Sequence, residues 1–392
     1  MMLDYGMPQL KQPDVAADIV RHFRERTTDT SEADLRVPIA NFVSDEHAAR
    51  ERELMRTLPL VVAHHSELPS AGSFITRNVL GTSIIIVRRA DGQVAAFLNM
   101  CRHRGGRVED ETSGTKRVFT CRYHGWSYDR DDGALRNVPF REYFESVDEA
   151  CSGLVPVQVE ESHGLIWATL RGGGPSVEEF LGEDASRQLA AFELAGSVMF
   201  LDETFTLDIN WKLVADGAID VLHPKFLHPN GVGKLIETGR SVWRPYGRHG
   251  QSFNPRKKLG ALVESGEPLE DVWKYVASNL VIYPNCSVIA APDHVEFWTA
   301  WPSATTASAS TVNIRFYIRE EILDEAMADR LNRSWAILRS AALEEDFPME
   351  ASIQANAIAN PDGTFLYGRN EASCQHLHLW LERDLAAMET GR

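Results

Sequence analysis

Two short segments of this 392-residue chain carry residue types that bind metals. CRHRG contributes Cys101 and His103, and CRYHGWSY contributes Cys121 and His124. Two thiolates and two imidazoles suit a [2Fe-2S] cluster in which the cysteines bind one iron and the histidines bind the other. Replacing two thiolates by neutral imidazoles raises the reduction potential of such a cluster. A structural zinc site is the alternative, because two cysteines and two histidines also make a tetrahedral shell. Usual zinc spacing keeps like ligands together, whereas each half here is mixed.

Short β-type segments must position these ligands. Ser83–Val87 and Val94–Leu98 flank the turn signal Asp91-Gly92, which predicts a hairpin whose second strand leads to Cys101. Val118–Cys121 is predicted to deliver the second ligand pair in the same way. The ligands are therefore expected at the tips of two β-hairpins.

A second group of metal-binding residue types lies in the C-terminal half. Asp220 and His223 stand three residues apart, so a helix would place them on the same side, and His228 follows Pro224. Proline disfavours helical geometry just before it, so the chain is expected to end or kink its helix there and bring His228 back. Two neutral imidazoles and one carboxylate form a facial triad for Fe(II) with positions open for dioxygen and substrate.

The two groups together resemble Rieske-type non-heme iron aromatic ring-hydroxylating oxygenases, in their alpha, or terminal oxygenase, subunit. The cluster motif Cys-x-His, seventeen residues, Cys-x-x-His matches the family's pattern, as does Asp-x-x-His-x-x-x-x-His. The segment NWK, 210–212, matches the stretch that precedes the second motif in the family. The resemblance extends from about Leu58 to Gln354.

The resemblance implies a role for each residue of the second group. His223 and His228 would bind the catalytic iron. Asp220 would bridge His223 to His124 of a neighbouring subunit and give electrons a short route between the metals. The family takes its third iron ligand from acidic residues before a glutamine, which predicts Asp346, with Glu345 as the alternative.

Two positions differ from the family's usual residues, so the resemblance does not identify the substrate. Leu222 stands where a tyrosine often precedes the first histidine, and Asp216 stands where Asn or Glu is frequent. A basic, aromatic stretch after His228 is predicted to be a solvated mobile loop over the entrance. The competing hypothesis is that one of its arginines meets a substrate carboxylate. Its basic residues are Arg240, Arg244, Arg248, His249, Arg256, Lys257 and Lys258.

The composition of the chain also bears on its partners and its cellular compartment. The net charge of −16 argues against a nucleic-acid partner, because phosphate neutralisation needs concentrated Lys and Arg. Beyond the motif, Cys151, Cys286 and Cys374 are an odd, scattered set, which favours a reducing compartment over a disulfide framework. No apolar run is long enough to span a bilayer, and the first ten residues lack a secretory pattern, so the cytoplasm is the expected location.

The predicted fold class is α+β. A small all-β Rieske [2Fe-2S] domain is expected at 58–172 and a catalytic iron domain at 176–392, with an antiparallel sheet covered by helices; residues 1–57 would be a helical segment packing on the latter. The boundary signal is RGGGP, 171–175. Predicted helices, the first with Asp14 as its N-cap, are Val15–Arg26, Asp45–Arg56, Ser176–Leu181, Asn210–Leu222, Asp324–Glu345 and Ala372–Met388. Further predicted strands are Val155–Val159, Leu165–Leu170, Met199–Leu207, Leu280–Ile289, Val295–Trp301 and Thr311–Ile318.

The resemblance implies a terminal oxygenase that uses dioxygen to hydroxylate an aromatic or related hydrophobic small molecule, by mono- or dioxygenation. An O- or N-demethylating monooxygenase is the alternative. Electrons would come from NAD(P)H through a separate reductase, with or without a ferredoxin, because the chain has no nucleotide-binding glycine fingerprint. A homotrimer is expected, with or without a small beta subunit. A zinc-stabilised binding protein and an electron carrier without catalysis are more distant alternatives.

Overall fold

The computed structural model describes residues 11–148, 152–266, 271–291 and 293–390, so Cys151 and the first ten residues lie outside the described part. The chain divides into two compact units. The small unit is Met55–Phe180, and the large unit combines Met1–Leu54 with Leu181–Arg392. Within the described residues, no helix combines the length and apolar character needed to cross a membrane.

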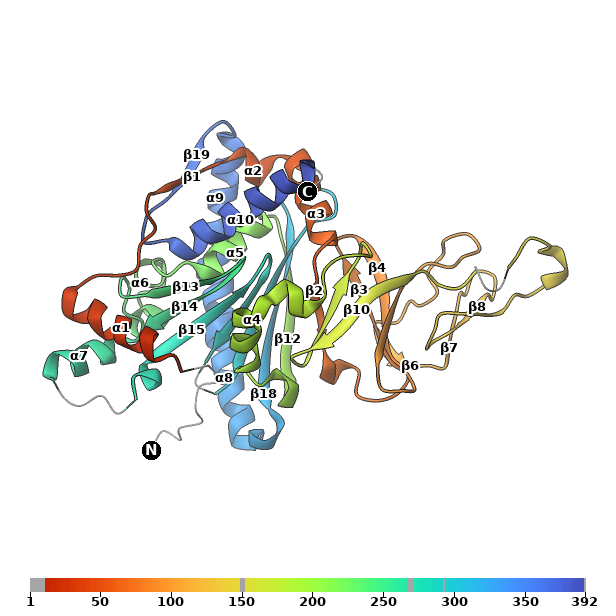
Figure 1. Ribbon diagram of the computed structural model, residues 1–392, viewed down its shortest axis with the longest axis horizontal. Coiled ribbons are helices and arrows are strands. Elements are labelled where there is room, and N and C mark those ends of the chain that lie inside the picture. The colour runs from red at the N-terminus through yellow and green to blue at the C-terminus, as the bar shows by residue number, and fades with distance from the viewer. Residues whose placement is uncertain (1–10, 149–151, 267–270, 292, 391–392) are drawn as a thin grey trace. The chain divides into compact units, whose positions relative to one another are not determined.

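The small unit is built from two antiparallel sheets (Figure 1). The larger sheet has the strand order β2-β11-β10-β5-β4-β3-β6, and the smaller sheet has the order β7-β8-β9. The strands are β2 (Leu60–His64), β3 (Ser73–Val79), β4 (Thr82–Arg88), β5 (Val94–Leu98), β6 (Ser113–Thr115), β7 (Val118–Thr120), β8 (Ser127–Asp129), β9 (Leu135–Asn137), β10 (Pro156–Ser162) and β11 (Leu165–Thr169). Two single 3₁₀ turns accompany them, η1 (His65–Glu67) and η2 (Arg141–Tyr143).

The hydrophobic core of the small unit explains why its loops are held in place. Phe74 of β3 packs edge-on against Phe119 of β7, with ring centroids 5.4 Å apart. The same buried cluster includes Trp126, Cys101 and Cys121. The two cysteines are therefore part of the core, and the loops that carry them are anchored by apolar packing.

The large unit contains a seven-stranded antiparallel sheet with the order β12-β18-β17-β16-β15-β14-β13, and a two-stranded ribbon, β1-β19. Its strands are β1 (Leu35–Pro38), β12 (Ser197–Leu207), β13 (Val242–Tyr246), β14 (His249–Pro255), β15 (Val276–Ile282), β16 (Cys286–Ala290), β17 (Val295–Pro302), β18 (Ser310–Arg319) and β19 (Thr364–Tyr367). Its helices, of which α4 begins before the boundary in sequence, are α1 (Pro13–Glu25), α2 (Ala40–Val43), α3 (Asp45–Arg56), α4 (Val177–Ala190), α5 (Trp211–Ile219), α6 (Pro224–Leu227), α7 (Lys257–Ser265), α8 (Glu325–Ala341), α9 (Phe347–Ala359) and α10 (Ala372–Glu389). The 3₁₀ turns are η3 (Leu194–Gly196), η4 (Val232–Lys234), η5 (Val272–Tyr275) and η6 (Glu320–Ile322), and the π-helical turn is η7 (Ala342–Asp346).

Helix α5 is the central helix of the large unit. It packs on β16, β17 and β18, and helices α9 and α10 pack on it in turn (Figure 1). Asn210 caps its N-terminus by accepting a hydrogen bond from the Lys212 amide. The buried Lys212 ammonium donates to Glu51 of α3 over 2.6 Å, and Trp211 donates to the same carboxylate. These contacts fix where α5 begins, and hence where its other end delivers Asp220.

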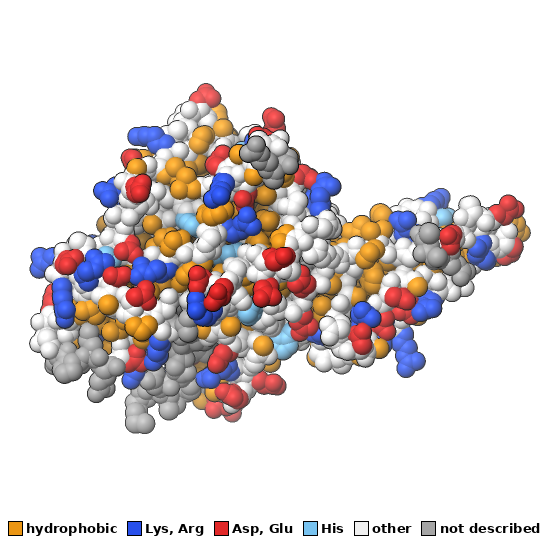
Figure 2. Space-filling model, viewed as in Figure 1, with side chains coloured by type: hydrophobic (Ala, Val, Ile, Leu, Met, Phe, Trp, Pro, Cys, Tyr) orange, Lys and Arg blue, Asp and Glu red, His pale blue; other side chains and the backbone are white. Residues whose placement is uncertain are grey.

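Charged side chains of both signs are interspersed over the face shown in Figure 2. The excess of acidic residues therefore does not gather into one large patch on that face. Mixed surface charge of this kind favours solubility and does not by itself indicate a partner.

Three local predictions are wrong. Helix α1 begins at Pro13, with Gln12 as the N-cap residue, so Asp14 lies in the first turn. The segment 280–289 forms a hairpin and not one strand, because β15 and β16 are separated by a turn with a cis Tyr283-Pro284 bond. The stretch 240–258 is not a loop, since it forms β13, β14 and the start of α7.

Candidate iron–sulfur and iron sites

The two cysteine loops of the small unit have the same backbone design. In each, the cysteine amide donates to the carbonyl five residues later, over 2.7 Å from Cys101 and 2.9 Å from Cys121. Four residues after each cysteine a glycine amide donates back to the cysteine carbonyl, and these glycines, Gly105 and Gly125, have φ of 77° and 74°. A side chain would be strained at this φ, so glycine permits the tight turn at both positions.

The four predicted ligands differ in burial according to residue type. Cys101 and Cys121 are buried, whereas His103 is half-buried and His124 is exposed. The Nδ1 atoms of the two histidines lie 3.2 Å apart. Thiols on the inner side and imidazoles on the outer side are the donor arrangement that a mixed-ligand [2Fe-2S] cluster requires, so the residues present fit that group.

The buried hydroxyl of Tyr128 contacts the thiol of Cys101. Tyr128 lies with its Oη 3.2 Å from Cys101 Sγ and accepts a hydrogen bond from the Arg102 amide at 2.9 Å. Burial, followed by the neighbouring thiol of Cys121, raises the pKa of Cys101 in the absence of metal. Iron bound by Cys101 would reverse that preference, because a coordinating thiol is deprotonated outright. Hydrogen bonds to the sulfur then adjust the reduction potential.

In the large unit, Asp220 ends α5 and orients the first histidine. Its backbone is extended at the C-cap, so Asp220 and His223 do not share a helical face as expected. Instead the Asp220 carboxylate accepts the backbone amides of Leu222 and His223 at 2.8 and 3.0 Å. It also lies 3.1 Å from His223 Nδ1. Burial opposes ionisation, but hydrogen bonding from His223 and from the amides lowers the pKa of Asp220 overall.

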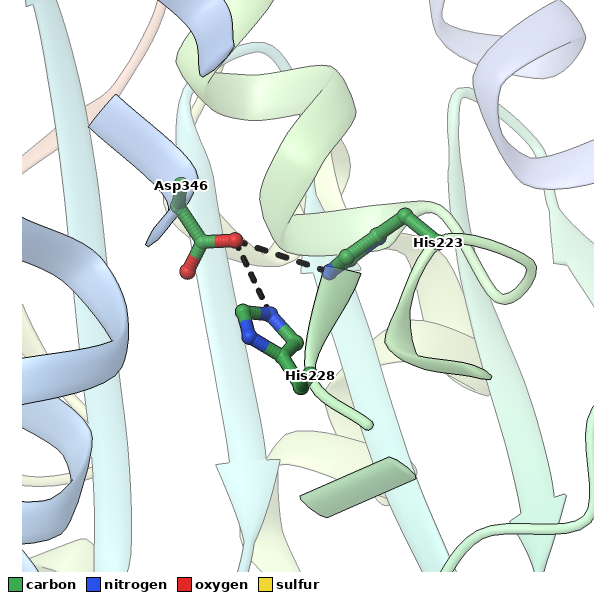
Figure 3. A group of neighbouring side chains, drawn as sticks. All are labelled: His223, His228 and Asp346. Atoms are coloured by element: carbon green, nitrogen blue, oxygen red, sulfur yellow. Dashed lines mark ion pairs between the residues drawn. The ribbon is translucent and has the colours of Figure 1, made fainter. Parts of the chain in front are cut away.

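The structure brings His223, His228 and Asp346 together (Figure 3). Asp346 Oδ1 lies 2.9 Å from His228 Nε2 and 3.8 Å from His223 Nε2, and one ligand atom from each of the three lies within 4.8 Å of the others. Helix α6 is the single turn that separates the histidines, with Pro224 near its start. Two imidazoles and one carboxylate in this arrangement suit Fe(II) and leave further positions open.

The other acidic residue expected near this site takes a different position. Glu345 Oε2 lies 2.5 Å from His228 Nδ1, on the opposite side of the ring from Asp346. Burial, together with the charge of Glu345, raises the pKa of Asp346, and the two histidines act against that shift. A cation bound between Asp346 and the histidines would relieve the cost of burying this carboxylate.

Sequence reasoning named Asp216 as a departure from the family pattern but missed the two buried residues that contact it. Asp216 of α5 accepts a hydrogen bond from Tyr367 Oη at 2.6 Å and lies 2.9 Å from His378 Nε2. Tyr367 ends β19 and His378 belongs to α10, so only the tertiary fold brings them to α5. No spacing in the sequence connects these three positions.

Glu350 is one of the acidic residues that precede Gln354, but sequence reasoning did not choose it as a site residue. It follows Asp346 by one turn of α9, its side chain is 7% exposed, and its Oε2 has no hydrogen-bond partner among the described residues. A Cβ placed on Gly217 of α5 would lie 2.3 Å from Glu350 Oε1, so glycine leaves the room that this carboxyl occupies. Burial, followed by the charges of Asp346 and Asp216, raises the pKa of Glu350 well above its usual value.

An apolar pocket lies between α5 and the sheet. Val214 and Ala218 line it from the helix, and Val281, Trp298 and Val312 line it from β15, β17 and β18. Small and branched side chains on α5 therefore leave space against the strands. The walls are suited to hydrophobic groups.

The basic stretch is engaged in contacts within the large unit. Arg244 pairs with Asp18 at 2.5 Å and with Asp29 at 3.4 Å, and Arg248 lies 3.4 Å from Asp384. Both arginines thus have carboxylate partners supplied by the protein. This weighs against a role for either in binding a substrate carboxylate.

Two family models match the chain. Residues 59–148 match the Rieske [2Fe-2S] domain, and residues 190–387 match the catalytic domain of the ring-hydroxylating alpha subunit. In the solved structure of a quaternary ammonium Rieske monooxygenase with L-carnitine, the fold agrees with a TM-score of 0.74 at 21% identity, covering 95% of this chain and 99% of that one. Naphthalene 1,2-dioxygenase from Rhodococcus sp. bound to indole gives 0.71 at 19% identity, covering 95% and 98%.

Curated relatives extend the comparison. The carnitine monooxygenase oxygenase subunit of Acinetobacter pittii (strain PHEA-2) is 34% identical over 305 residues, which cover 75% of this chain and 77% of that protein. The large oxygenase component of the naphthalene 1,2-dioxygenase system of Pseudomonas fluorescens is 32% identical over 190 residues, covering 47% and 41%. The chain spans about half the length of several such dioxygenase components. It belongs to the Rieske-type ring-hydroxylating oxygenase alpha subunit family, whose two domains hold a [2Fe-2S] cluster and a mononuclear iron.

Proposed function

We propose that this protein is the terminal oxygenase component of a multicomponent Rieske oxygenase. It would use dioxygen, with electrons from NAD(P)H delivered by a separate reductase, to oxidise a small organic molecule. The observation that carries this proposal is the convergence of His223, His228 and Asp346 in a chain that also presents Cys101 and His124 in a cluster motif. A chain that only carried electrons would have no need of the second site.

The two proposed sites have different roles in the reaction. The cluster, when bound, supplies single electrons, and the mononuclear iron supplies the site at which dioxygen is activated. Cys101 and Cys121, which are buried, and His103 and His124, which lie further outward, would hold the cluster. His223 and His228 turn their Nε2 atoms toward Asp346, while Asp220 fixes the ring of His223.

We propose that electrons pass between subunits, from the cluster of one to the iron of the next, through His124 and the Asp220 of that neighbour. Support comes from the exposure of His124 and of apolar side chains in the same unit. Tyr123 is 63% exposed, Phe140 74% and Tyr143 79%. Exposed aromatic side chains near a redox centre are suited to a protein contact.

A homotrimer is the assembly we propose for this transfer. A ferredoxin between reductase and cluster, a small beta subunit and a cytoplasmic location are compatible with it. Ultracentrifugation of the purified protein would test the oligomeric state, and a monomer that turns over at full rate would contradict transfer between subunits.

Electron paramagnetic resonance with metal analysis tests the proposed class. We expect the reduced mixed-ligand cluster signal and three iron atoms per chain. Colourless protein with zinc and no iron would support the zinc-stabilised alternative instead. Turnover that survives His223→Ala would support a pure electron carrier.

For the substrate, the first candidate is an aromatic or related hydrophobic compound that is hydroxylated. Apolar side chains between α5 and the sheet, among them Val214, Ala218 and Trp298, are consistent with it, because they offer few polar contacts. Relatives named as naphthalene dioxygenase components are consistent with this candidate. Oxygen uptake with a supplied reductase, compared across neutral aromatic compounds, would test it.

The second candidate is oxidative N-demethylation or a related monooxygenation of a cationic amine. Glu350 favours it, because its buried Oε2 has no hydrogen-bond partner among the described residues, and a cationic ligand would offset the burial and the charges of Asp216 and Asp346 that raise its pKa. The relative named carnitine monooxygenase is consistent with it. Choline and its neutral isostere 3,3-dimethylbutanol differ only in charge. Tighter binding of choline that disappears in Glu350→Gln would support this candidate, and equal binding of the two would favour the first.

A further inference from the structure

The two histidines of the candidate iron site have equivalent surroundings. Each turns Nε2 toward Asp346 Oδ1, at 3.8 Å from His223 and 2.9 Å from His228. Each has a carboxylate at Nδ1, which is Asp220 at 3.1 Å for His223 and Glu345 at 2.5 Å for His228. Both histidines therefore lie between two carboxylates, with Asp346 shared at Nε2 and a separate carboxylate at Nδ1 of each ring.

The π-helical turn η7 explains how two consecutive residues reach the same ring. Successive side chains on an α-helix diverge by about 100°, because the helix has about 3.6 residues per turn. Here Glu345 and Asp346 contact opposite nitrogens of His228. The wider turn over Ala342–Asp346 precedes α9, and short π-helical turns are frequent at functional sites.

We propose that Glu345 is a positioning residue that holds His228, and that it is not an iron ligand. Its carboxylate accepts the Nδ1–H of His228 and so leaves the Nε2 lone pair facing Asp346. This inference rests on the proposed iron site, and it goes beyond it by giving His228 the same kind of outer partner that Asp220 gives His223. A metal-binding imidazole needs such a partner to fix its tautomer and ring orientation.

Geometry separates the two acids at this site. The point shared by both histidine Nε2 atoms is occupied by Asp346 Oδ1, whereas Glu345 lies at the other edge of the His228 ring. The ring is held by burial, since the His228 side chain is 4% exposed, while that of Glu345 is 37% exposed. Glu345 would have to displace Asp346 or reverse a buried ring to reach the metal.

The experiment measures metal affinity and not turnover. The mononuclear site is emptied by a chelator under conditions that retain the cluster absorbance, and Co(II) is titrated by calorimetry into wild type, Glu345→Ala and Glu345→Gln. We expect Glu345→Ala to weaken Co(II) binding about 10–100-fold, the usual effect of losing an outer partner of a metal ligand. Glu345→Gln should stay within a few-fold of wild type, because its amide oxygen still accepts the Nδ1–H.

Glu344→Ala is the matched control. Glu344 is the preceding acidic residue on the same turn, it is exposed, and its removal changes the net charge equally. Unchanged affinity in this variant shows that general charge attraction is not responsible. The Co(II) electron paramagnetic resonance signal should broaden in Glu345→Ala, because the ring then adopts more than one orientation.

Three results would overturn the inference: Glu345→Ala binds Co(II) as wild type does, Glu345→Gln falls as far as Glu345→Ala, or Glu344→Ala weakens binding equally. Failure of the proposed function looks different. In that case wild type itself takes up no Co(II) that depends on His223 and Asp346.

Discussion

The cluster site and the iron site are built in opposite ways. The proposed cluster ligands lie on two loops of the same backbone design, each closed by a glycine and anchored by its own buried cysteine. The iron-site residues come from a helix end, a single helical turn and a π-helical turn far along the chain. A site made of repeated local loops depends mainly on its own segments, whereas a site assembled from distant elements depends on the packing of the whole unit.

The largest expected effect is the loss of the cluster in Cys121→Ser. A serine hydroxyl is a poor substitute for a thiolate ligand at this site, so the cluster absorbance and signal should disappear together with turnover. Co(II) binding at the iron site should remain. Cys286→Ser, which alters a buried free cysteine on β16, is the control and should keep the cluster. Retained cluster signal in Cys121→Ser would contradict the ligand assignment.

The next effect distinguishes the two acids at the iron site. Asp346→Ala should lose mononuclear iron and reduce turnover by more than about 100-fold, since removing a ligand costs more than removing an outer partner. The cluster signal should stay at the wild-type level. Iron analysis and steady-state oxygen uptake measure both. Normal iron content in Asp346→Ala would make Glu345 the ligand instead.

Asp220→Asn should have an intermediate effect that links the two sites. The asparagine keeps one oxygen and can still accept the Leu222 amide, but it lacks the second oxygen, which accepts the His223 amide, and the charge that favours the proposed bridge is lost. We expect electron transfer to slow about 10–100-fold with both metals bound. Single-turnover kinetics of a pre-reduced cluster provide the measurement. A wild-type rate would exclude Asp220 from the electron route.

The smallest effect concerns stability, and it tests the dependence of the iron site on packing. Burial would raise the pKa of Glu51, but the charge of Lys212 and the contacts with His47 outweigh it and lower the pKa to about 2. Lys212→Ala leaves Glu51 buried without that cation and should reduce the free energy of unfolding by about 3–5 kcal/mol. Arg21→Ala, which removes an exposed pair with Asp18, should leave the free energy of unfolding nearly unchanged.

The pH dependence of the same pair has a definite sign. The folded-state pKa of Glu51 is depressed from 4.5 to about 2, so its stabilising contribution is present above pH 4.5 and is lost as the pH falls through 2. Denaturant unfolding of wild type between these values should show falling stability. The loss should be smaller in Lys212→Ala, and an equal loss in both proteins would contradict the pairing.

Sequence patterns predicted most of the regular structure. Helix α3 and strand β5 have the predicted bounds, because Asp45 begins a helix-favouring run and Val94–Leu98 follows a clear turn signal. The segment 280–289 was predicted as one strand because its apolar residues hide the turn at Pro284. The stretch 240–258 was predicted as a loop because charged residues outnumber apolar ones, yet its arginines find partners on other elements.

The candidate site residues likewise fall into those that sequence spacing could identify and those that it could not. The residues from Cys101 to His124 could be named from spacing, because one local segment contains them all. Asp346 and Glu345 could not be separated, since both precede Pro348 and only the π-helical turn assigns them to different nitrogens of His228. Tyr367 and His378 carried no sequence signal, because only their burial against α5 gives them their importance.

The π-helical turn also affects how relatives should be aligned. A π-helical turn amounts to one residue inserted into a continuous helix, so residues before it and after it keep different registers. Gln354 lies after the turn, and its side chain accepts a hydrogen bond from the Asn210 amide at 2.8 Å, which ties α9 to the start of α5. Counting backward from that glutamine should therefore locate the residue that corresponds to Asp346, the proposed third ligand, in distant relatives. Counting forward from α8 would shift the assignment by one residue wherever the inserted residue is absent.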